Sequence, residues 1–392
     1  MKPRLLIAGG SHADIPVIEA AKKLGFHVIT SGNNPADLGH RYSDEQHYED
    51  YSDPEAILRL ASKLEVDALC ASSNDFSALS CAYAAQKLGL VGHDPYETVR
   101  IIHHKHRFRQ FAQKHGLPVP RAVVLPAGDG VFPELSEDLG FPLIVKPVDL
   151  SGGKGMRRVE STQELVDAVE NARRLSRQRE IVVEEFIEGS NHGYSALLSN
   201  GKIVFAFMDD EHYFLNPYLV SGASSSLSDT PALRTKLDAA LERLASLLNL
   251  TDGLLHVQFI LRDNEPYLLE ICRRTPGDLY LKLIEYATGF SMAEAIVSSV
   301  AGQTPPPFLP RTKRWISRHC VMAERTGPIS RVDYGVFEDK IFDRLRFYTR
   351  GEQIEKIMTY KAEIDFIEYS DASEMRKLRP KLTEEIKIRY LA

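Results

Sequence analysis

The stretch Pro142-Leu143-Ile144-Val145-Lys146-Pro147, followed by Ser151-Gly152-Gly153-Lys154-Gly155-Met156, decides how this chain folds. A short apolar run between prolines predicts a buried strand that carries a lysine at its end. The glycines that follow let the backbone come close to a ligand and turn its N–H groups toward it. A lysine on a strand beside a glycine-rich flap is suited to holding the phosphates of a nucleotide. The alternative is a lysine that reaches solvent from a strand end, ahead of an ordinary glycine turn.

The composition bounds the class of protein. The chain of 392 residues is longer than one hydrophobic core usually organises, so we expect two or three domains. A net charge of −6 argues against a nucleic-acid partner. The apolar run at 5–8 is too short for a signal peptide or a membrane span, and we expect a cytoplasmic protein with no membrane partner. The cysteines lack the CxxC spacing of a zinc site.

Residues 4 to 95 alternate short apolar runs with helical patterns, which predicts βαβ units and a parallel sheet. The expected strands are 5–8, 27–30 and 68–71, and the expected helices are 16–24, 53–64 and 78–88. Gly9-Gly10-Ser11-His12 follows the first strand but is not GxGxxG, so an NAD site is not expected. For Ser11, His12 and the segment 73–75 we prefer turn and helix-capping roles to ligand binding.

The rest of the chain alternates between the two patterns less regularly. A long helix is expected at 96–115, and further helices at 162–175, 231–248 and 279–288. Further strands are expected at 122–125, 181–184, 195–198 and 203–207. Residues 209–228, rich in Ser, Gly and Asn, are expected to be a loop that acts as a lid. Prolines 305–307 and Pro310 mark a linker to a small strand-rich C-terminal part.

Two further apolar runs, 254–261 and 266–272, predict a β-hairpin. Strand alternation places His256 and Gln258 on one face of the first strand, and Glu270, Cys272 and Arg274 on one face of the return strand, with Leu269 and Ile271 opposite. Gln258 and Glu270 are then close to facing each other. Oxygen ligands on two rigid strands suit Mg²⁺, and Arg274 suits a phosphate or a carboxylate. The alternative is the solvent-facing side of an ordinary hairpin.

The run Val182-Val183-Glu184-Glu185-Phe186-Ile187 ends a strand with acidic and apolar residues. Backbone N–H and C=O groups that leave a sheet at such a point can bind the edge of an adenine, while apolar side chains hold its ring. Taken alone, acidic residues at a strand end are usually just solvated.

Taken in order, these pieces resemble the ATP-grasp superfamily, in the branch of biotin carboxylase and carbamoyl-phosphate synthetase, and are closest in character to L-amino-acid ligases. The resemblance covers nearly the whole chain and implies an α/β and α+β protein. A parallel-sheet βα (pre-ATP-grasp) domain would precede a two-lobed ATP-grasp fold and a small strand-rich part. The implied domains are the βα domain at 1–95, the first lobe with the flap at 96–190, the second lobe with the metal-binding hairpin at 191–310 and the C-terminal subdomain at 311–392.

The resemblance also implies site residues and cofactors. The cofactors are ATP and Mg²⁺, with Mn²⁺ as an alternative metal. Arg274 and Lys146 become catalytic residues, and Gln258 and Glu270 become metal ligands. The residues implied to bind the nucleotide are Lys105, Lys146, Ser151, Gly152, Gly153, Gly155, Glu184, Glu185, Ile187 and Asn191.

The chain departs from the family pattern at two positions. Asn191 stands where the family usually has an acidic residue for the ribose, although an amide can still hydrogen-bond a hydroxyl. Cys272 stands where it usually has an asparagine metal ligand. A thiol is a poor partner for Mg²⁺, so the second metal site would be weakened or completed by another group.

The activity that the resemblance implies is that of an ATP-dependent ligase. It would join a small-molecule carboxylate to an amine, or to a thiol, through an acyl phosphate, and release ADP and phosphate. A homodimer is the oligomer we expect. The alternatives are a bicarbonate-activating carboxylase of the biotin carboxylase or purine-pathway type, and a non-catalytic nucleotide-binding module. Absence of HRD, DFG and GK[ST] motifs argues against a protein kinase and a Walker-type NTPase.

Overall fold

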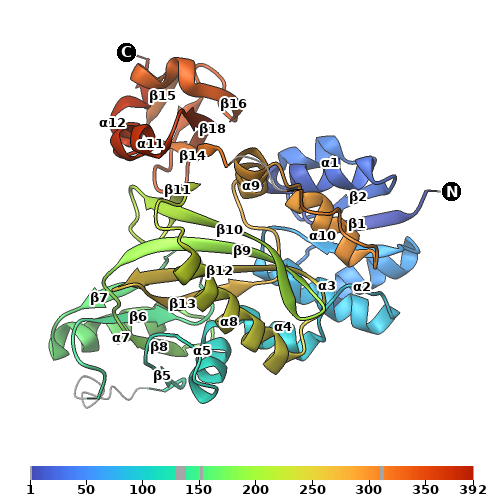
Figure 1. The fold of residues 1–392 in the computed structure, drawn as a ribbon, viewed down its shortest axis with the longest axis horizontal. Helices are drawn as coiled ribbons and strands as arrows, with labels where there is room; N and C mark the ends of the chain where they lie inside the picture. Colours follow the sequence, from blue (N-terminus) through green and yellow to red (C-terminus); the bar gives the residue numbers. More distant parts are fainter. Residues whose placement is uncertain (1, 129–137, 151–152, 310–312, 392) are drawn as a thin grey trace.

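The computed structural model describes residues 2–128, 138–150, 153–309 and 313–391. It is the predicted mixed α/β protein, with a parallel N-terminal sheet and a large antiparallel sheet (Figure 1). Three residues named in the sequence predictions, Ser151, Gly152 and Pro310, lie outside the described residues.

The N-terminal unit is a parallel sheet in the order β3-β2-β1-β4 with helices around it. Asn74 caps α3 by accepting a hydrogen bond from the Phe76 N–H, which confirms the capping role expected there. The elements are β1 (Arg4–Ala8), a 3-10 helix (His12–Asp14), α1 (Ile15–Lys23), β2 (His27–Ser31), a 3-10 helix (Leu38–Tyr42), β3 (Glu45–His47), α2 (Pro54–Lys63), β4 (Ala68–Ala71) and α3 (Asp75–Leu88).

The prediction of one long helix at 96–115 is wrong, because this segment forms two helices. The chain forms α4 (Tyr96–His103) and α5 (Lys105–Lys114), separated at His104, whose backbone is extended with φ −103° and ψ 112°. The break turns α5 away from α4, so that Lys105 begins a new helix. The physical consequence is that the lysine stands at a helix start rather than in a helix interior.

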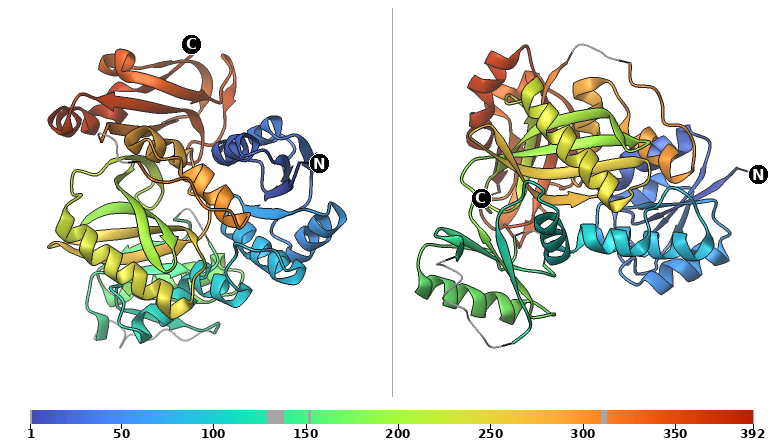
Figure 2. Two further views of the ribbon diagram at one scale, coloured as in Figure 1. Left: turned by 45° about the vertical axis from the view of Figure 1, so that its right-hand side comes forward. Right: turned by 60° about the horizontal axis from the view of Figure 1, so that its bottom comes forward.

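The first lobe is a four-stranded antiparallel sheet in the order β5-β8-β6-β7, covered by α7 (Figure 2). The strand expected around Lys146 lies in the middle of this sheet and is buried along its length. The elements are β5 (Ala122–Leu125), β6 (Leu143–Pro147), β7 (Arg157–Val159), α7 (Thr162–Leu175) and β8 (Ile181–Glu185).

The second lobe is built on an eight-stranded sheet in the order β13-β12-β9-β10-β11-β14-β18-β16. Leucines 233, 237, 241 and 244 form one stripe of α8 and pack against β9, β12 and β13. The elements are β9 (Ser190–Ser199), β10 (Lys202–Tyr213), β11 (Val220–Ser225), α8 (Pro231–Leu248), β12 (Gly253–Arg262), β13 (Glu265–Cys272), α9 (Tyr280–Thr288) and α10 (Met292–Val300).

The lid expected at 209–228 is largely wrong, because most of this segment is strand. Residues 209–213 continue β10 and pair with β11 in an antiparallel register. The small residues Gly222, Ala223, Ser224 and Ser225 are buried in the middle of the sheet, between β10 and β14. Ser and Gly therefore indicate close strand packing here rather than a loop.

The C-terminal part continues the same large sheet, since β14 and β18 pair side by side and β14 also pairs with β11. A second, smaller sheet holds β17, β15 and β19. Figure 1 places this part at the upper left, above β10 and β11, with the N-terminal unit to its right. The elements are β14 (Trp315–Met322), β15 (Gly327–Asp333), a 3-10 helix (Gly335–Lys340), β16 (Ile341–Arg346), β17 (Gln353–Ile354), β18 (Lys361–Tyr369), α11 (Ala372–Leu378), a 3-10 helix (Arg379–Lys381), α12 (Leu382–Glu385) and β19 (Lys387–Tyr390).

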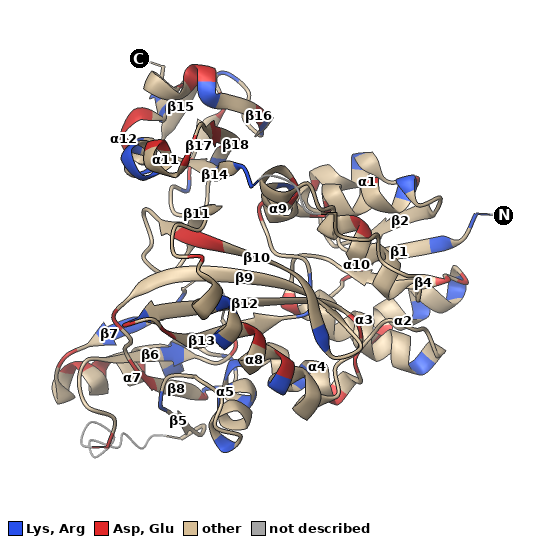
Figure 3. Ribbon diagram, in the orientation of Figure 1, with Lys and Arg blue, Asp and Glu red and all other residues tan. Residues whose placement is uncertain are grey.

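Basic and acidic positions are intermixed along most elements (Figure 3). One exception is the acidic run at 209–211, which colours the end of β10 red. Among the described residues, no helix combines the length and the apolar character that crossing a membrane requires.

Candidate functional site

A cavity of about 790 Å³ gathers residues from the first lobe, the large sheet and the start of α3. Most of the residues predicted from the sequence line it. These are Lys105, Lys146, Gly153, Glu184, Glu185, Ile187, Asn191, Gln258, Glu270 and Arg274. Gly155 does not line the cavity; a side chain there would meet Pro147 and Leu175.

Lys146 lies in a buried charged triad at the back of the cavity. Its Nζ is 2.6 Å from Glu184 Oε2, and Arg109 Nε donates to Glu184 Oε1 at 2.9 Å. Burial opposes the charge on Glu184, but Arg109 and Lys146 outweigh it and hold the pKa of Glu184 at about 2. Burial lowers the pKa of Lys146. The strand thus presents a lysine whose position is fixed by a carboxylate.

Arg109 is a residue that the sequence predictions missed. It lies on α5 and also donates to the carbonyls of Leu268 and Leu269, at 3.0 and 3.1 Å. Arg109 therefore ties together the first lobe, through Glu184, and the β12–β13 hairpin. An arginine within an amphipathic helix carries no sequence signal for such a role.

Gly153 and Lys105 both line the cavity. Gly153 has φ +72°, and a Cβ there would come within 2.5 Å of Tyr218 Cβ, so Gly153 packs closely on the turn between β10 and β11. Lys105 Nζ donates to the Leu150 carbonyl at 3.3 Å and lies 3.8 Å from Glu270 Oε1. Lys105 thus links Leu150 to the hairpin that carries Glu270.

The segment 184–187 is fixed by its backbone before any ligand arrives. The N–H groups of Glu185 and Phe186 donate to the carbonyls of Arg121 and Pro142, at 2.9 and 3.0 Å. The guanidinium of Arg158 lies over the Phe186 ring, 4.8 Å from its centre. Apolar side chains of Ile144, Met156, Ile187, Ile260 and Leu269 surround this end of the cavity. The segment can therefore hold a flat aromatic ring among apolar groups.

Gln258 and Glu270 are directly paired across β12 and β13, as predicted. The Gln258 amide N–H donates to Glu211 Oε1 at 2.6 Å. A carboxamide and a carboxylate oxygen on rigid strands suit Mg²⁺, which fills its shell with water and phosphate oxygens. Burial raises the pKa of the Cys272 thiol to about 11, and its Sγ faces the Arg274 carbonyl at 3.6 Å, so Cys272 does not suit this metal.

The predicted alternation on β13 fails at one point. A β-bulge lies opposite Gln258 and Phe259, whose partners are Glu270 and Leu268. Leu268 and Ile271 consequently fill the core, whereas Leu269, expected beside Ile271 on the core face, lines the cavity. Among the described residues, no group of three or more His, Cys, Asp or Glu side chains could hold a metal by itself.

Arg274 is fixed by the N-terminal unit. Its Nε donates to Asp75 Oδ1 at 2.7 Å, and His103 Nδ1 lies 2.9 Å from the same oxygen. Burial opposes the charge on Asp75, but Arg274 and His103 outweigh it and hold the pKa of Asp75 well below its usual range. Arg273 points elsewhere and binds Asp94 at 2.8 Å, as expected from its alternation with Arg274. Asp75 was expected to be a capping residue; it lines the cavity instead.

The deep end of the cavity holds residues that the sequence predictions missed. Asp209 and Glu211 alternate along β10, and both line the cavity with Tyr280 and Arg318. Burial, with the neighbouring Glu211, raises the pKa of Asp209 well above its usual range. The acidic run at 209–211 was visible in the sequence, but its strand was taken for a loop.

Comparisons with known proteins agree with this geometry. Residues 102–277 match the ATP-grasp domain family. The carbamoyl phosphate synthase large chain of Pseudothermotoga lettingae is 24% identical over 303 residues, which cover 74% of this chain and 26% of that protein. Phosphoribosylglycinamide synthetase from Anaerococcus prevotii matches with a TM-score of 0.80 at 21% identity, over 99% of this chain and 100% of that one. The L-amino acid ligase from Bacillus licheniformis matches with a TM-score of 0.80 at 19% identity, over 100% of both chains.

The fold and the cavity define a two-lobed nucleotide-binding protein with a βα domain in front. Within it, residues 102–277 match the ATP-grasp domain family, in agreement with the resemblance drawn from the sequence. The chain spans about a quarter of the length of the curated relatives it matches.

Proposed function

We propose that this protein is an ATP-dependent carboxylate–amine ligase that works through an acyl phosphate. The observation that carries the proposal is the pairing of Gln258 with Glu270 in a cavity that also holds Lys105, Lys146 and Arg274. Two oxygen ligands beside three cations are what transfer of a phosphoryl group requires.

Each residue has a part in holding the nucleotide. The segment 184–187 holds the adenine, with Glu184, Glu185 and Ile187 around it, and Asn191 reaches the ribose. Lys105 and Lys146 bind phosphate oxygens, and the flap at 151–155 covers them. Gln258 and Glu270 would hold Mg²⁺, with Mn²⁺ as a substitute, and the metal ion would neutralise charge on the phosphates.

The reaction then proceeds in two steps. A substrate carboxylate oxygen attacks the γ-phosphorus of ATP, and the bond to the bridging oxygen of ADP breaks, while Arg274 binds the transferred phosphoryl group. The amine next attacks the carbonyl carbon of the acyl phosphate. A C–N bond forms, the C–O bond to phosphate breaks, and the amine loses a proton. Closure of the flap excludes water, which would otherwise hydrolyse the intermediate.

The alternatives differ at the deep end of the cavity. Asp209 and Glu211 give this end two carboxylates, an environment that favours an amine over a bicarbonate anion. Retention of Lys105, Lys146, Gln258, Glu270 and Arg274 argues against a module that only binds nucleotide. We further propose that the domains span 1–95, 96–190, 191–310 and 311–392. The same proposal includes a homodimer, a cytoplasmic location and a thiol as an alternative acceptor.

The test is release of ADP and phosphate from MgATP across pools of amino acids and small carboxylates, with and without bicarbonate. We expect release that needs one carboxylate pool and one amine pool together. Release driven by bicarbonate would instead identify a carboxylase. MgATP binding with no release in any pool would contradict the ligase and favour the binding module.

The contact between Arg274 and Asp75 gives a second prediction for this reaction. Asp75→Asn removes the charge that orients the guanidinium, so we expect kcat to fall about 10- to 100-fold with a smaller change in the KM for ATP. Steady-state ADP release measures both constants. Asp94→Asn is the matched control, because it removes the aspartate partner of the neighbouring Arg273, away from the main cavity. An equal loss of kcat in both variants would contradict a positioning role for Asp75.

A further inference from the structure

We propose that Asp209 and Glu211 form the subsite for a primary ammonium group on the amine substrate. The inference deepens the proposed ligase by naming the chemical group that the deep end of the cavity receives. The bound amine is a substrate only if the protein is the proposed ligase, so that part of the inference rests on the proposed function. The binding of a cation is argued from contacts within the cavity alone.

The carboxylate of Asp209 is completely buried and only partly bonded. Its side chain has an exposed fraction of 0%. Oδ1 accepts a hydrogen bond from the Tyr280 hydroxyl, but Oδ2 has no partner among the described residues. A buried carboxylate oxygen without a donor is costly, and burial already raises the pKa of this group, so a cation that enters the cavity would stabilise the charged form of Asp209.

The sheet is built to accommodate this carboxylate. Asp209 pairs with Gly193 across β10 and β9. A Cβ at Gly193 would come within 2.3 Å of Asp209 Oδ1, so any larger residue would displace the carboxylate. Gly193 therefore leaves space for the buried carboxylate of Asp209. The packing of the sheet does not itself require an acidic group at this position.

Glu211 adds a second charge two residues along the same face of β10. Its Oε1 accepts from the Gln258 amide and its Oε2 from the Tyr213 hydroxyl, each at 2.6 Å. All of these donors are neutral. Among the described residues, neither Asp209 nor Glu211 has a lysine or arginine within ion-pair distance. Arg318, in the same cavity, therefore acts on the two carboxylates only from beyond ion-pair distance.

Arg318 supplies an independent observation from the opposite charge. Its guanidinium is 3% exposed and lines the same cavity, and its Nε has no hydrogen-bond partner among the described residues. Its Nη1 donates to the Asp278 carbonyl at 3.0 Å and lies 3.7 Å from Asp278 Oδ2, so the charge is already compensated and Nε is the group left without a partner among the described residues. One wall of the cavity thus holds an unpaired acceptor and an unpaired donor that do not pair with each other. A ligand with a cationic nitrogen and an acceptor oxygen would satisfy both.

The subsite lies next to the proposed phosphoryl-transfer groups, because Glu211 is bonded directly to Gln258. An ammonium group held there would be close to the carbonyl carbon of an acyl phosphate formed at Gln258, Glu270 and Arg274, and it would attack as the free amine after the carboxylate of Asp209 or Glu211 accepts one of its protons. This proximity distinguishes a subsite for the attacking amine from a cation site elsewhere on the protein.

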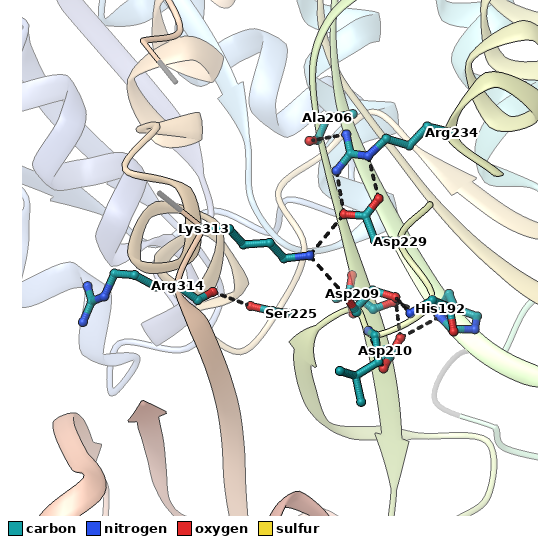
Figure 4. Close-up of polar contacts among 12 residues, drawn as sticks. His192, Ala206, Asp209, Asp210, Ser225, Asp229, Arg234, Lys313 and Arg314 are labelled. Atoms are coloured by element: carbon teal, nitrogen blue, oxygen red, sulfur yellow. Dashed lines mark hydrogen bonds and ion pairs between the residues drawn. The ribbon is translucent and has the colours of Figure 1, made fainter. Parts of the chain in front are cut away.

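Asp210, between the two residues, provides the contrast. It does not line the cavity, and its carboxylate is fully bonded by His192, Ser226, Arg379 and the Leu227 N–H. Figure 4 shows His192 beside both Asp210, with which it forms an ion pair, and Asp209, whose main-chain carbonyl it contacts. The same strand therefore carries a carboxylate whose charge is already compensated, which makes Asp210→Asn a matched control.

The test measures the binding of propylammonium to the full chain, in the presence of MgADP, by saturation-transfer NMR. The controls are 1-propanol as a neutral analogue and propionate as an anionic analogue. We expect contact with propylammonium and not with the other two. Because each substitution removes a charge-assisted hydrogen bond, Asp209→Asn and Glu211→Gln should each weaken the binding of propylammonium by at least about tenfold. Asp210→Asn should leave it unchanged. Thermal melting and MgADP binding check that each variant is folded. If Asp209→Asn does not fold, Glu211→Gln alone tests the subsite.

Two results would overturn the subsite: no contact of propylammonium with the wild type, or equal binding by wild type, Asp209→Asn and Glu211→Gln. The measurement needs no turnover, so it is separable from the ligase. Cation binding without ADP release in any pool would leave the subsite standing and refute the ligase. Amine-dependent release without cation binding at Asp209 would do the reverse.

Discussion

Glu270→Ala is expected to abolish magnesium-dependent ADP release while leaving the fold intact. Glu270 is half-exposed at the cavity, faces Gln258 in register and supplies the only carboxylate of the proposed metal pair. A metal ion stabilises the transition state of phosphoryl transfer by several kcal/mol, and each 1.36 kcal/mol is tenfold in rate. Loss of this ligand should therefore lower kcat at least about 100-fold. A Mg²⁺ titration of ADP release measures the effect.

Glu265→Gln is the control for this variant. Glu265 begins the same strand, is exposed and pairs with Lys236 outside the cavity. We expect this change to leave turnover and its Mg²⁺ dependence as in the wild type. Turnover of Glu270→Ala within threefold of wild type would show that the metal assignment is wrong, whatever the substrates are.

Those parts of the fold that depend on local patterning could be predicted from the sequence. The helices at 162–175 and 231–248 end where expected, and they begin where expected because Ser161 and Thr230 accept hydrogen bonds from the first turn of each. The βα alternation of the first 95 residues likewise predicted the parallel sheet. In each case the signal lies within a few residues of the element that it determines.

Features that depend on distant contacts could not be predicted. The break at His104 separates α4 from α5 without a proline or a glycine at that position. The bulge at Leu269 changes which leucine faces the core, although the apolar pattern of β13 gives no sign of it. The serines and glycine at 222–225 resemble a loop, yet they are buried because β14, about ninety residues later, pairs with them.

The residues of the candidate site likewise fall into those that the local sequence pattern predicts and those that only distant contacts determine. Lys146, Gln258, Glu270 and Arg274 lie at strand ends or alternate along a hairpin, so that their position followed from the period of the strand. Arg109, Asp75 and Arg318 act through partners more than thirty residues away in sequence. Their residue types are ordinary for a helix, a cap and a strand, so only the tertiary structure identifies them.

Arg109→Met is expected to destabilise the protein strongly. Arg109 and Glu184 are 3% and 2% exposed, and Lys146 is the only other cation bonded to Glu184 among the described residues. Breaking a buried ion pair by removing one partner costs about 3–5 kcal/mol, because the remaining charge is left insufficiently compensated. Chemical denaturation at pH 7 measures the loss in the free energy of unfolding.

Arg107→Met is the control for this comparison. Arg107 lies on the same helix, is partly exposed and is 3.7 Å from the exposed Glu97. An exposed pair of this kind contributes about 0–1 kcal/mol, so the control separates the buried triad from a general effect of removing a positive charge from α5. Equal destabilisation by the two substitutions would contradict the role given to Arg109.

The difference between wild type and Arg109→Met should also depend on pH in a defined direction. Burial opposes the charge on Glu184, but Arg109 and Lys146 outweigh it and lower its pKa from 4.5 to about 2 in the folded state. A carboxyl whose pKa is lowered by folding contributes stability above its unfolded pKa, and loses it as the pH falls through the folded value. The difference in unfolding free energy should therefore be largest above about pH 4.5 and shrink between pH 4.5 and pH 2. A difference that stays constant over this range would mean that Arg109 stabilises the protein through packing rather than through the charge of Glu184.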